Sequence, residues 1–417
     1  MSVTSLEAHW PPVPVRLDVE RWATRKISRR VLAVVHTVTA GQRLLDAIRL
    51  LEGDTRVQVC FTSAPDVFSN GVASFLEELK GLVLPWSQAV QTPFDLALAA
   101  AHGSLHELHA PVIVLPHGAG HNKITPGGGR GRTVAERGVY GLSRQRLIRD
   151  GAVVPESIVL AHEEERTRLG RECPEALPAA EVVGDPCYDR MVASLPSRAL
   201  YREALRTRAH QRLVLVCSTW GPHSLLGQGT ELLERLVGEL PRDEFRVAAL
   251  LHPNVWNAHG EWQIRSWLAG LARAGLTVVS QYGDWVGAVA AADYIVGDHG
   301  SIALYGAMTG VPVLMAGFPD PDLDPGSPLA ELRSFAPRLH ADRPLRRQLD
   351  RSSATYRARQ YEQVAARITS EPGRFARKMR ALIYRKLRLR APAVRPTTEP
   401  ARLPVTLRYD EPGSVAS

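Results

Sequence analysis

The chain has 417 residues, of which 45% are hydrophobic and 23% are charged, and this composition is enough for a large apolar core. At about 100–200 residues per domain, the length predicts two domains. The net charge of +8 is uneven, because residues 373–390 (GRFARKMRALIYRKLRLR) hold eight Lys and Arg and no acidic residue. The remainder is close to neutral, which argues against a general nucleic-acid-binding protein.

The sequence carries no sign of export or membrane insertion. No run of about 18 apolar residues is present, so we expect no transmembrane helix. The first 20 residues lack the basic start and apolar stretch of a secretory signal. The four cysteines show no Cys-x-x-Cys spacing and fit buried, reduced thiols. We therefore expect a cytoplasmic protein.

Apolar, strand-like runs alternate with helical patterns from residue 31 onward. The first run, VLAVVH at 31–36, precedes a segment in which Leu44, Leu45, Ile48 and Leu51 recur at helical spacing. The same alternation continues through RVQVCFTSAP, LVLPW, PVIVLPHG, ESIVLAHEEERTRL and AEVVGDP. Continuous apolar strands separated by helices indicate a parallel sheet covered on both faces.

A second series begins at RLVLVCST and runs through FRVAALLHP, LTVVSQ, YIVGDHG and VPVLMAG. We predict an α/β fold of two doubly wound, Rossmann-like domains facing each other across a cleft. The N-terminal domain spans 29–192, a connector spans 193–210, and the C-terminal domain spans 211–335. We expect residues 1–28 to be mobile, 336–391 to form a basic helical extension, and the Pro-rich polar stretch 392–417 to be disordered.

Polar residues follow three strands of the C-terminal domain, and ligands of open α/β sheets bind at the carboxyl ends of the strands. These strand ends are Thr219-Trp220-Gly221, His252-Pro253-Asn254 and Gly297-Asp298-His299-Gly300-Ser301. We expect Ser301 to cap the helix that follows, and Gly297 and Gly300 to let the backbone approach a ligand closely. Free amides at the positive end of the helix dipole then predict an anion site.

In the N-terminal domain, the strand PVIVLP ends in HGAGHNKITPGGGRGR. His117 stands at the carboxyl end of this strand, and Gly118, Gly120 and Lys123 follow it. A histidine in this place can act as a general base. The glycine-rich run is not a P-loop, because no Gly-Lys-Ser/Thr follows at the required spacing.

Several of these segments together resemble the GT-B-type transferases of the CDP-glycerol glycerophosphotransferase kind, which are teichoic-acid-polymer enzymes, over about residues 110 to 335. More distantly the chain resembles the UDP-N-acetylglucosamine 2-epimerases. PHGAGHNK is similar to the family motif Trp-His-Gly-Thr-Pro-x-Lys at His117, Gly118 and Lys123. The other matching positions are Gly184, Pro186 and Asp189 in GDPCYD, Thr219 and Trp220 in STWG, His252-Pro253, Asp298 and Ser301 in DHGS, and Asp322 and Asp324 in PDLD.

The sequence also departs from the family motifs. Pro116 stands in place of the tryptophan, and Lys123 lies one position late. Cys187 and Gly221 stand where the family carries arginines. The loss of two cations changes how a phosphate-rich donor is held, so we expect either a donor or acceptor other than CDP-glycerol and glycerol phosphate, or a loss of activity.

The resemblance implies a nucleotide-diphosphate donor bound to the C-terminal domain. We assign catalytic roles to His117, His252 and Asp298. The residues assigned to substrate binding are Gly118, Lys123, Thr219, Trp220, Asn254, His299, Gly300 and Ser301. The amides near Gly300 and Ser301, with His252, would stabilise the leaving nucleotide, and His117 would take the proton of an acceptor hydroxyl. This scheme requires no metal and no other cofactor.

Alternatives remain open at this point. Attack at phosphorus transfers glycerophosphate and attack at an anomeric carbon transfers a sugar, with a polyol, sugar or lipid-linked acceptor in either case. A sugar-nucleotide 2-epimerase fits less well, because STWGPHSLLG does not resemble the His-Arg-x-Glu-Asn stretch of that family. A non-catalytic nucleotide- or polymer-binding protein is a third interpretation, supported by the two absent arginines.

Two other features of the sequence concern metals and membranes. His102, His106 and His109 would share one helical face and suit zinc, but a solvated polar face explains them more simply. The basic segment 373–390 has an apolar stripe that either packs on the protein or lies on an anionic membrane surface, and packing is slightly favoured. Nucleic acid is the least favoured partner, because only Phe375 and Tyr384 accompany its cations.

Overall fold

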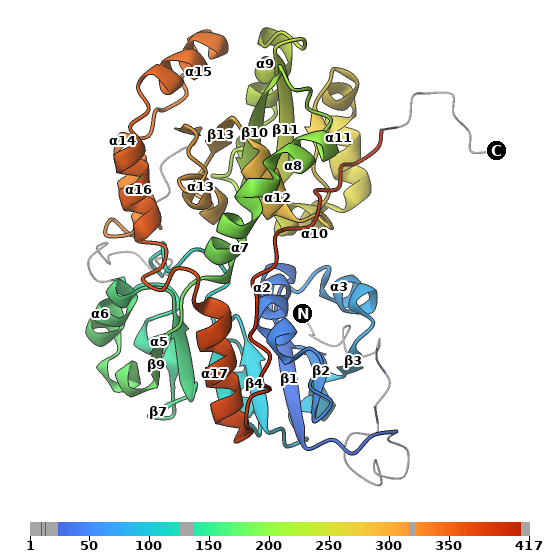
Figure 1. Cartoon of the computed structure of the whole chain (residues 1–417), viewed down its shortest axis with the longest axis vertical. Coiled ribbons are helices and arrows are strands. Elements are labelled where there is room, and N and C mark those ends of the chain that lie inside the picture. The colour runs from blue at the N-terminus through green and yellow to red at the C-terminus, as the bar shows by residue number, and fades with distance from the viewer. Residues whose placement is uncertain (1–9, 11–12, 14–23, 126–136, 317–321, 410–417) are drawn as a thin grey trace, which may run out of the picture. The chain divides into compact units, whose positions relative to one another are not determined.

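The computed structural model describes residues 10, 13, 24–125, 137–316 and 322–409 (Figure 1). The chain forms two compact units. Unit 1 comprises residues 1–186 and 369–397, and unit 2 comprises residues 187–368 and 398–417. Each unit contains a parallel sheet with helices on its faces, which confirms the predicted α/β class and the two Rossmann-like domains. The cleft predicted between the domains stays a prediction.

The sheet of unit 1 has the strand order β3-β2-β1-β4-β5-β8-β9, and all of its neighbouring strands are parallel. Its strands are β1 (Arg29–Val35), β2 (Val57–Ser63), β3 (Leu82–Leu84), β4 (Leu96–Ala99), β5 (Val112–Val114), β8 (Ser157–Leu160) and β9 (Ala180–Val182). The apolar runs of the sequence become these strands because both faces of the sheet are covered. A separate hairpin joins β6 (Ile148–Arg149) to β7 (Ala152–Val153).

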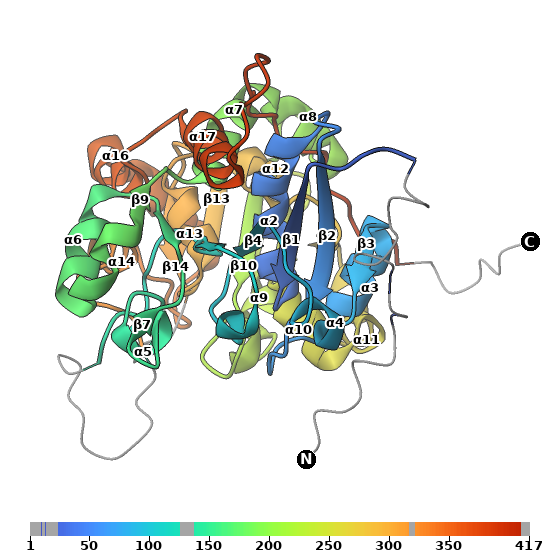
Figure 2. The ribbon, with the colours of Figure 1, turned by 90° about the horizontal axis from the view of Figure 1, so that it is seen from below.

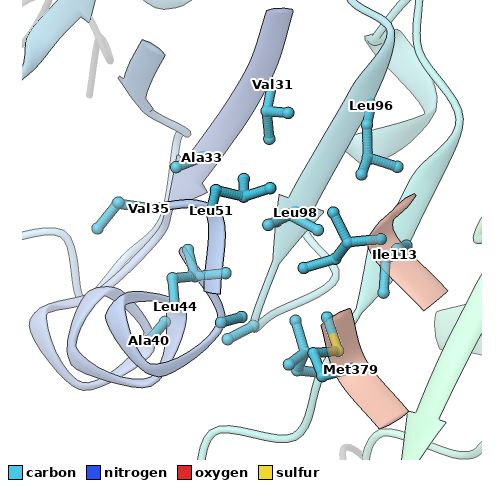
Figure 3. Packing of buried hydrophobic residues seen from close by; sticks show 14 of the residues in the cluster. Val31, Ala33, Val35, Ala40, Leu44, Leu51, Leu96, Leu98, Ile113 and Met379 are labelled. Carbon is cyan, nitrogen blue, oxygen red and sulfur yellow. The ribbon is translucent and has the colours of Figure 1, made fainter. Parts of the chain in front are cut away.

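Helices cover both faces of this sheet, as Figure 2 shows around β1 and β2. The helices of unit 1 are α2 (Val38–Ile48), α3 (Val72–Leu79), α4 (Trp86–Ala89), α5 (Arg144–Leu147), α6 (Glu163–Glu172) and α17 (Phe375–Leu387). Alternate residues of β1 point to opposite faces. Val31 and Ala33 pack with Leu44 of α2 and Met379 of α17 in one core cluster (Figure 3), while Leu32 belongs to a second cluster on the other face.

The basic segment 373–390 contains helix α17, which belongs to the core of unit 1. Its apolar stripe is buried, and the stripe consists of Phe375, Met379, Leu382, Ile383 and Leu387. The favoured expectation that this stripe packs on the protein is therefore confirmed. Association of the basic segment with an anionic membrane surface stays a prediction. In the part of the chain that the structure describes, no helix is long and apolar enough to span a bilayer.

The sheet of unit 2 has the order β12-β11-β10-β13-β14, again with parallel neighbours throughout. Its strands are β10 (Arg212–Ser218), β11 (Phe245–Leu251), β12 (Thr277–Val278), β13 (Tyr294–Gly297) and β14 (Val313–Met315). The chain moves outward from β10 to β12 and then returns to the other side of β10 for β13. The gap between the carboxyl ends of β10 and β13 is therefore the topological switch point, where ligands of such sheets bind.

Helices surround this second sheet as well. They are α7 (Pro186–Ser194), α8 (Arg198–Ala204), α9 (Glu231–Glu239), α10 (Pro253–His259), α11 (Glu261–Arg273), α12 (Trp285–Ala291), α13 (Ser301–Gly306), α14 (Pro328–Phe335), α15 (Leu345–Ala354) and α16 (Ala358–Ala366). Leu233 and Leu236 of α9, Leu268 of α11 and Leu349 of α15 share one buried cluster with Val216 of β10.

The units divide the chain differently from the predicted domains. The predicted extension 336–391 is split, because α15 and α16 belong to unit 2 and α17 to unit 1. The predicted connector 193–210 contains α8, which packs on α12. Of the predicted mobile start, Val13 exchanges hydrogen bonds of 2.9 and 2.5 Å with Gln88, and most other residues of 1–28 lie outside the described part.

The expectation of a disordered tail is wrong for residues 392–409. Thr406 bridges Val279 in antiparallel fashion. The amide of Ser280 donates to Val405 O at 2.8 Å, and the amide of Leu407 donates to Val278 O at 2.9 Å. A polar, Pro-rich stretch is held here by backbone hydrogen bonds at the exposed edge of β12, which its composition alone does not reveal. Residues 410–417 lie outside the described part.

Candidate active site

Four histidines gather at the carboxyl edge of the sheet in unit 1. His36 follows β1, His102 follows β4, and His117 and His121 follow β5. The rings are close enough for electrostatic interaction, since His36, His117 and His121 all act on the ionisation of His102. The topology brings these residues together because the carboxyl ends of neighbouring parallel strands meet at one edge.

His117 has its tautomer fixed by the backbone. Its Nδ1 lies 3.0 Å from Ala100 O, and a carbonyl oxygen only accepts, so Nδ1 carries the proton and Nε2 keeps its lone pair. The side chain of His117 is exposed to solvent at its surface. The protein packed around the ring nevertheless disfavours its charged form and lowers its pKa, and the charge of Arg43 acts in the same direction. The hydrogen bond to Ala100 O acts in the opposite direction and raises the pKa. The ring is therefore neutral at pH 7 and has a basic nitrogen available.

A buried arginine anchors the loop on one side of His117. Arg43, on α2, donates through Nη2 to Gly118 O at 3.2 Å and pairs through Nη1 with Asp185 at 3.3 Å. Both charged groups are almost fully buried, so each requires the other. Asp185 lies inside GDPCYD, and its carboxylate holds the loop after β5 through Arg43. Gly118 thus takes part through its carbonyl, and Lys123, further along, is exposed.

A histidine–carboxylate pair anchors the same loop on the other side. Oε1 of Glu165 accepts from the backbone amide of His121 at 3.1 Å and lies 2.9 Å from its Nδ1, while Oε2 accepts from the amide of Ala161 at 2.7 Å. Burial alone would raise the pKa of Glu165, but His121, the Ala161 amide and Arg168 together hold it below its ordinary value. A side chain at Gly120 is excluded, because φ is +63° and an ideal Cβ would lie 2.7 Å from Oε1.

The other two histidines are held neutral. Burial lowers the pKa of His36, whose Nε2 lies 2.7 Å from Gly103 O. Burial lowers the pKa of His102 to about 3, and its neighbours His121 and His36 contribute. An ideal Cβ at Gly141 would lie 3.1 Å from Nε2 of His121 and 3.9 Å from Nε2 of His102, so both nitrogens flank this glycine.

The structure gives no support to zinc at the histidines that follow β4. The segment forms a 3₁₀ turn at Leu105–Glu107 in place of the expected helix, so His102, His106 and His109 do not share a helical face. Within residues 24–125, 137–316 and 322–409, no group of three or more His, Cys, Asp or Glu side chains is arranged to hold a metal ion.

In unit 2, Asp298 ties together the ends of β10 and β13. Its Oδ2 accepts from the amides of Thr219 and Leu225, each at 2.9 Å, and its Oδ1 accepts from the amide of Gly300 at 3.1 Å. The side chain is buried. A carboxylate that accepts from several amides is stabilised in its charged form. Asp298 therefore shapes the loop after β10 at the switch point.

The corner before α13 differs from the expectation in two details. Gly300, with φ of −83°, is the N-cap, and Ser301 is the first helical residue, so the expected Ser301 cap is wrong. Gly297 makes room for the helix itself, because an ideal Cβ there would lie 2.8 Å from Cβ of Ala303. The amide of Gly300 donates to Asp298. The next two amides, those of Ser301 and Ile302, have no acceptor within the helix.

His252 caps the start of α10. Its Nδ1 accepts from the amide of Asn254 at 3.1 Å, so the proton of the neutral ring lies on Nε2. The ring centroid lies 6.3 Å from that of Trp220, which is 39% exposed. His299 is buried beside Asp298 in the chain. Gly221, where the family carries an arginine, has φ of +89°, a conformation that favours glycine.

The structure thus brings the predicted residues together in two groups. Residues Thr219, Trp220, His252, Asn254 and Asp298 to Ser301 lie at the carboxyl edge of unit 2, and His117, Gly118 and Lys123 follow β5 in unit 1. Sequence reasoning missed Arg43, Asp185, His121 and Glu165. His121 stands in the quoted PHGAGHNK stretch, and Glu165 stands beside Glu164, which is exposed at the start of α6.

Comparison with known proteins gives matches of structure only. No protein-family model matches the sequence, and no curated protein matches it. A variant of the wall teichoic acid polymerase TagF soaked with CDPG superposes with a TM-score of 0.57 and 12% identity, over 87% of this chain and 90% of that one. TagF itself gives a TM-score of 0.54 and 12% identity, over 87% and 89%.

A third solved structure, Anabaena Alr3699/HepE in complex with UDP-glucose, has a TM-score of 0.48 and 13% identity, over 86% of this chain and 99% of that one, which is too low to carry an argument. The likeness to TagF spans most of both chains, and at 12% identity it establishes the fold alone. It confirms the resemblance to the CDP-glycerol glycerophosphotransferase enzymes at that level. This chain has the GT-B fold.

Proposed function

We propose that this protein is a transferase that moves a glycerophosphate or glycosyl group from a nucleotide-diphosphate donor to an acceptor hydroxyl. The observation that carries the proposal is the state of His117. A neutral imidazole with Nδ1 fixed on Ala100 and a basic Nε2 is what a general base requires at pH 7. The fold shared with TagF, a variant of which was soaked with CDPG, supports the same class of donor.

The donor diphosphate is assigned to unit 2. The amides of Ser301 and Ile302 begin α13, and the Nε2–H of His252 is a donor at the end of β11. Amides and imidazole N–H groups at the switch point suit an anion. The exposed ring of Trp220 gives a flat apolar face for a base or sugar ring, and Asp298 holds the loop that carries it. In this proposal no metal ion is required.

The proton of the acceptor is assigned to His117. As the O–H bond of the acceptor breaks, the proton passes to Nε2, and the oxygen forms a bond to phosphorus or to the anomeric carbon. The bond from that atom to the nucleotide oxygen breaks, and the charge left on the nucleotide is stabilised by the donors of unit 2. The acceptor is a polyol, a sugar or a lipid-linked alcohol of the cell envelope or of secondary metabolism.

A second candidate is a nucleotide-binding protein without turnover. The observation that favours it is the absence of both family arginines, since Gly221 has a backbone conformation that favours glycine and Cys187 is buried. The two candidates differ in one result. Incubation of the purified protein with CDP-glycerol, UDP-sugars and GDP-sugars, with mass spectrometry of the products, should show consumption of one donor by the parent and none by His117→Gln. Binding without consumption of any donor would favour the second candidate.

A further inference from the structure

Four arginines at the amino edge of the sheet in unit 2 are left without acidic partners. They are Arg206 and Arg208, which follow α8, Arg242, in the turn before β11, and Arg246, the second residue of β11. Arg246 is half-buried and the other three are exposed. Across the described ranges of the chain, none of the four forms an ion pair or a side-chain hydrogen bond.

Other arginines of unit 2 do form ion pairs. Arg198 and Arg202 both pair with Asp293, at 2.7 and 2.5 Å. Arg212 and Arg346 share Glu244, at 3.5 and 2.7 Å. The carboxylates of this region are therefore already engaged. Glu203 and Asp243, which adjoin the cluster in sequence, form no ion pair with it among the residues described.

One buried side chain holds the segments of this cluster together. Gln211 accepts from the amide of Arg208 at 2.8 Å through Oε1, and donates from Nε2 to Arg242 O at 2.6 Å. Its backbone oxygen accepts from Arg202 at 2.6 Å. The end of α8 and the turn before β11 are thereby fixed to each other. The backbone positions from which Arg208 and Arg242 extend are therefore fixed by the fold.

Two polar atoms are buried in these segments without any partner. Nε of Arg246 is covered by protein and has no hydrogen-bond partner. The same holds for Oγ1 of Thr207, which lies between Arg206 and Arg208 and is only 7% exposed. A buried polar atom without a partner destabilises the folded state, because it has lost its hydrogen bonds to water. Burial and the charges of Arg206, Arg208 and Arg242 also lower the pKa of Arg246, because nearby like charges disfavour its charged form.

Repulsion and unpartnered donors at one place are both relieved by an anion. We propose that Arg206, Arg208, Arg242 and Arg246, with Thr207, form a binding site for a ligand that carries several phosphate groups. Guanidinium groups match phosphate oxygens with paired hydrogen bonds, and four cations exceed what a single phosphate neutralises. The site lies at the opposite edge of the sheet from the proposed donor site, because Arg246 and His252 stand six residues apart along β11, or about 20 Å.

Inorganic tripolyphosphate is a direct probe of this site, and titration calorimetry measures its binding to the whole protein. The double variant Arg208→Gln/Arg242→Gln changes two exposed side chains, so we expect it to fold and to bind at least about tenfold more weakly. Arg374→Gln removes one charge from unit 1 and should leave the affinity within about twofold, since the charges that act on Arg246 are those of Arg206, Arg208 and Arg242. Arg246→Gln adds a second, partly buried position and should also weaken binding.

A second experiment distinguishes two possible sources of the phosphate groups. Flotation with vesicles of phosphatidylglycerol and phosphatidylcholine tests a membrane surface, where many lipid phosphates lie together, against a free phosphate compound. Flotation of the parent but not of the double variant assigns the site to lipid, and loss of tripolyphosphate binding without flotation of either assigns it to a free compound. The proposal is overturned if the parent binds neither probe, if the double variant binds like the parent, or if Arg374→Gln weakens binding equally.

This test does not depend on the proposed transferase activity. The double variant Arg208→Gln/Arg242→Gln changes only the amino edge of the sheet and should bind a nucleotide donor as the parent does. If no nucleotide donor binds the protein, the calorimetry with tripolyphosphate still decides whether the arginine site exists.

Discussion

Nδ1 of His121 lies 2.9 Å from Oε1 of Glu165, and the same oxygen accepts the backbone amide of His121 at 3.1 Å. These two bonds fix the far end of the loop that begins at His117, while Arg43 fixes its near end through Gly118 O at 3.2 Å. The geometry of the proposed base therefore depends on one carboxylate in α6 and one guanidinium in α2, neither of which is predicted to touch substrate.

Glu165→Gln should destabilise the protein by about 2–4 kcal/mol, because the hydrogen bonds that two amides and an imidazole donate to this buried carboxylate are weakened. Urea unfolding followed by circular dichroism measures the change. Glu164→Gln, at the exposed neighbour, is the control and should change stability by less than about 0.5 kcal/mol. Equal stability of parent and Glu165→Gln would contradict the anchoring role.

The same carboxylate predicts a dependence on pH. The pKa of Glu165 is below its ordinary value of 4.5 in the folded protein, so its contribution is fully present above the unfolded value and is lost as pH falls through the folded value. The stability difference between parent and Glu165→Gln should therefore be constant near pH 7 and shrink in acid below pH 4.5. A difference that grows in acid would show that the carboxylate is not stabilised by folding.

His117→Gln should reduce turnover by about 10²–10⁴-fold and leave the affinity for the nucleotide donor unchanged, because only the proton acceptor is removed. Since the pKa of His117 lies below 6.5, the acid limb of the parent's kcat/KM profile should also fall below pH 6.5. Steady-state kinetics from pH 4.5 to 8 measures both effects. His109→Gln, in the loop before β5, should behave like the parent. Turnover retained by His117→Gln would reject this histidine as the base.

Asp298→Asn should destabilise unit 2 by about 2–4 kcal/mol and weaken donor binding together. The amide group of asparagine offers one acceptor oxygen in place of two, so at least one of the amides of Thr219, Leu225 and Gly300 loses its partner. Thermal unfolding and calorimetry on the same samples measure both quantities. Asp342→Asn, at an exposed position, should change neither. Loss of turnover with intact stability and binding would instead assign Asp298 a direct chemical role.

Met379→Ala should cost about 2–5 kcal/mol, because Met379 is fully buried in the core cluster that joins α17 to β1 and α2. Arg377→Ala, exposed on the same helix, should be nearly neutral. Denaturant unfolding distinguishes them. If Met379→Ala leaves stability unchanged, α17 does not pack as described and its stripe is available for other contacts.

The strand edges were predictable from the sequence because each apolar run is long enough to be a buried strand and ends in polar residues. That reasoning placed His117, His252 and Asp298 after β5, β11 and β13. It could not show which atoms those side chains contact. From the sequence, we predict that Asp298 is a catalytic carboxylate. In the structure it accepts hydrogen bonds from three amides, which come from segments up to 79 residues away.

Residues brought together from distant segments were missed for the same reason. Glu165 is 44 residues from His121, and Asp185 is 142 residues from Arg43. No local pattern links the members of either pair. The prediction of a disordered tail is wrong for a different reason. Residues 405–407 are held by backbone hydrogen bonds to the edge of β12, and such bonds do not depend on the side chains that determine composition.

Calorimetric titration of CDP-glycerol, UDP-glucose and GDP-mannose into the parent protein and into His252→Ala tests the central claim most directly. The account predicts that at least one of these donors binds the parent and that His252→Ala binds it about tenfold or more weakly, since the variant lacks the Nε2–H donor and the cap of α10. His259→Ala, at the other end of the same helix, should bind like the parent. If the parent binds none of the three nucleotides, the donor site assigned to unit 2 is contradicted.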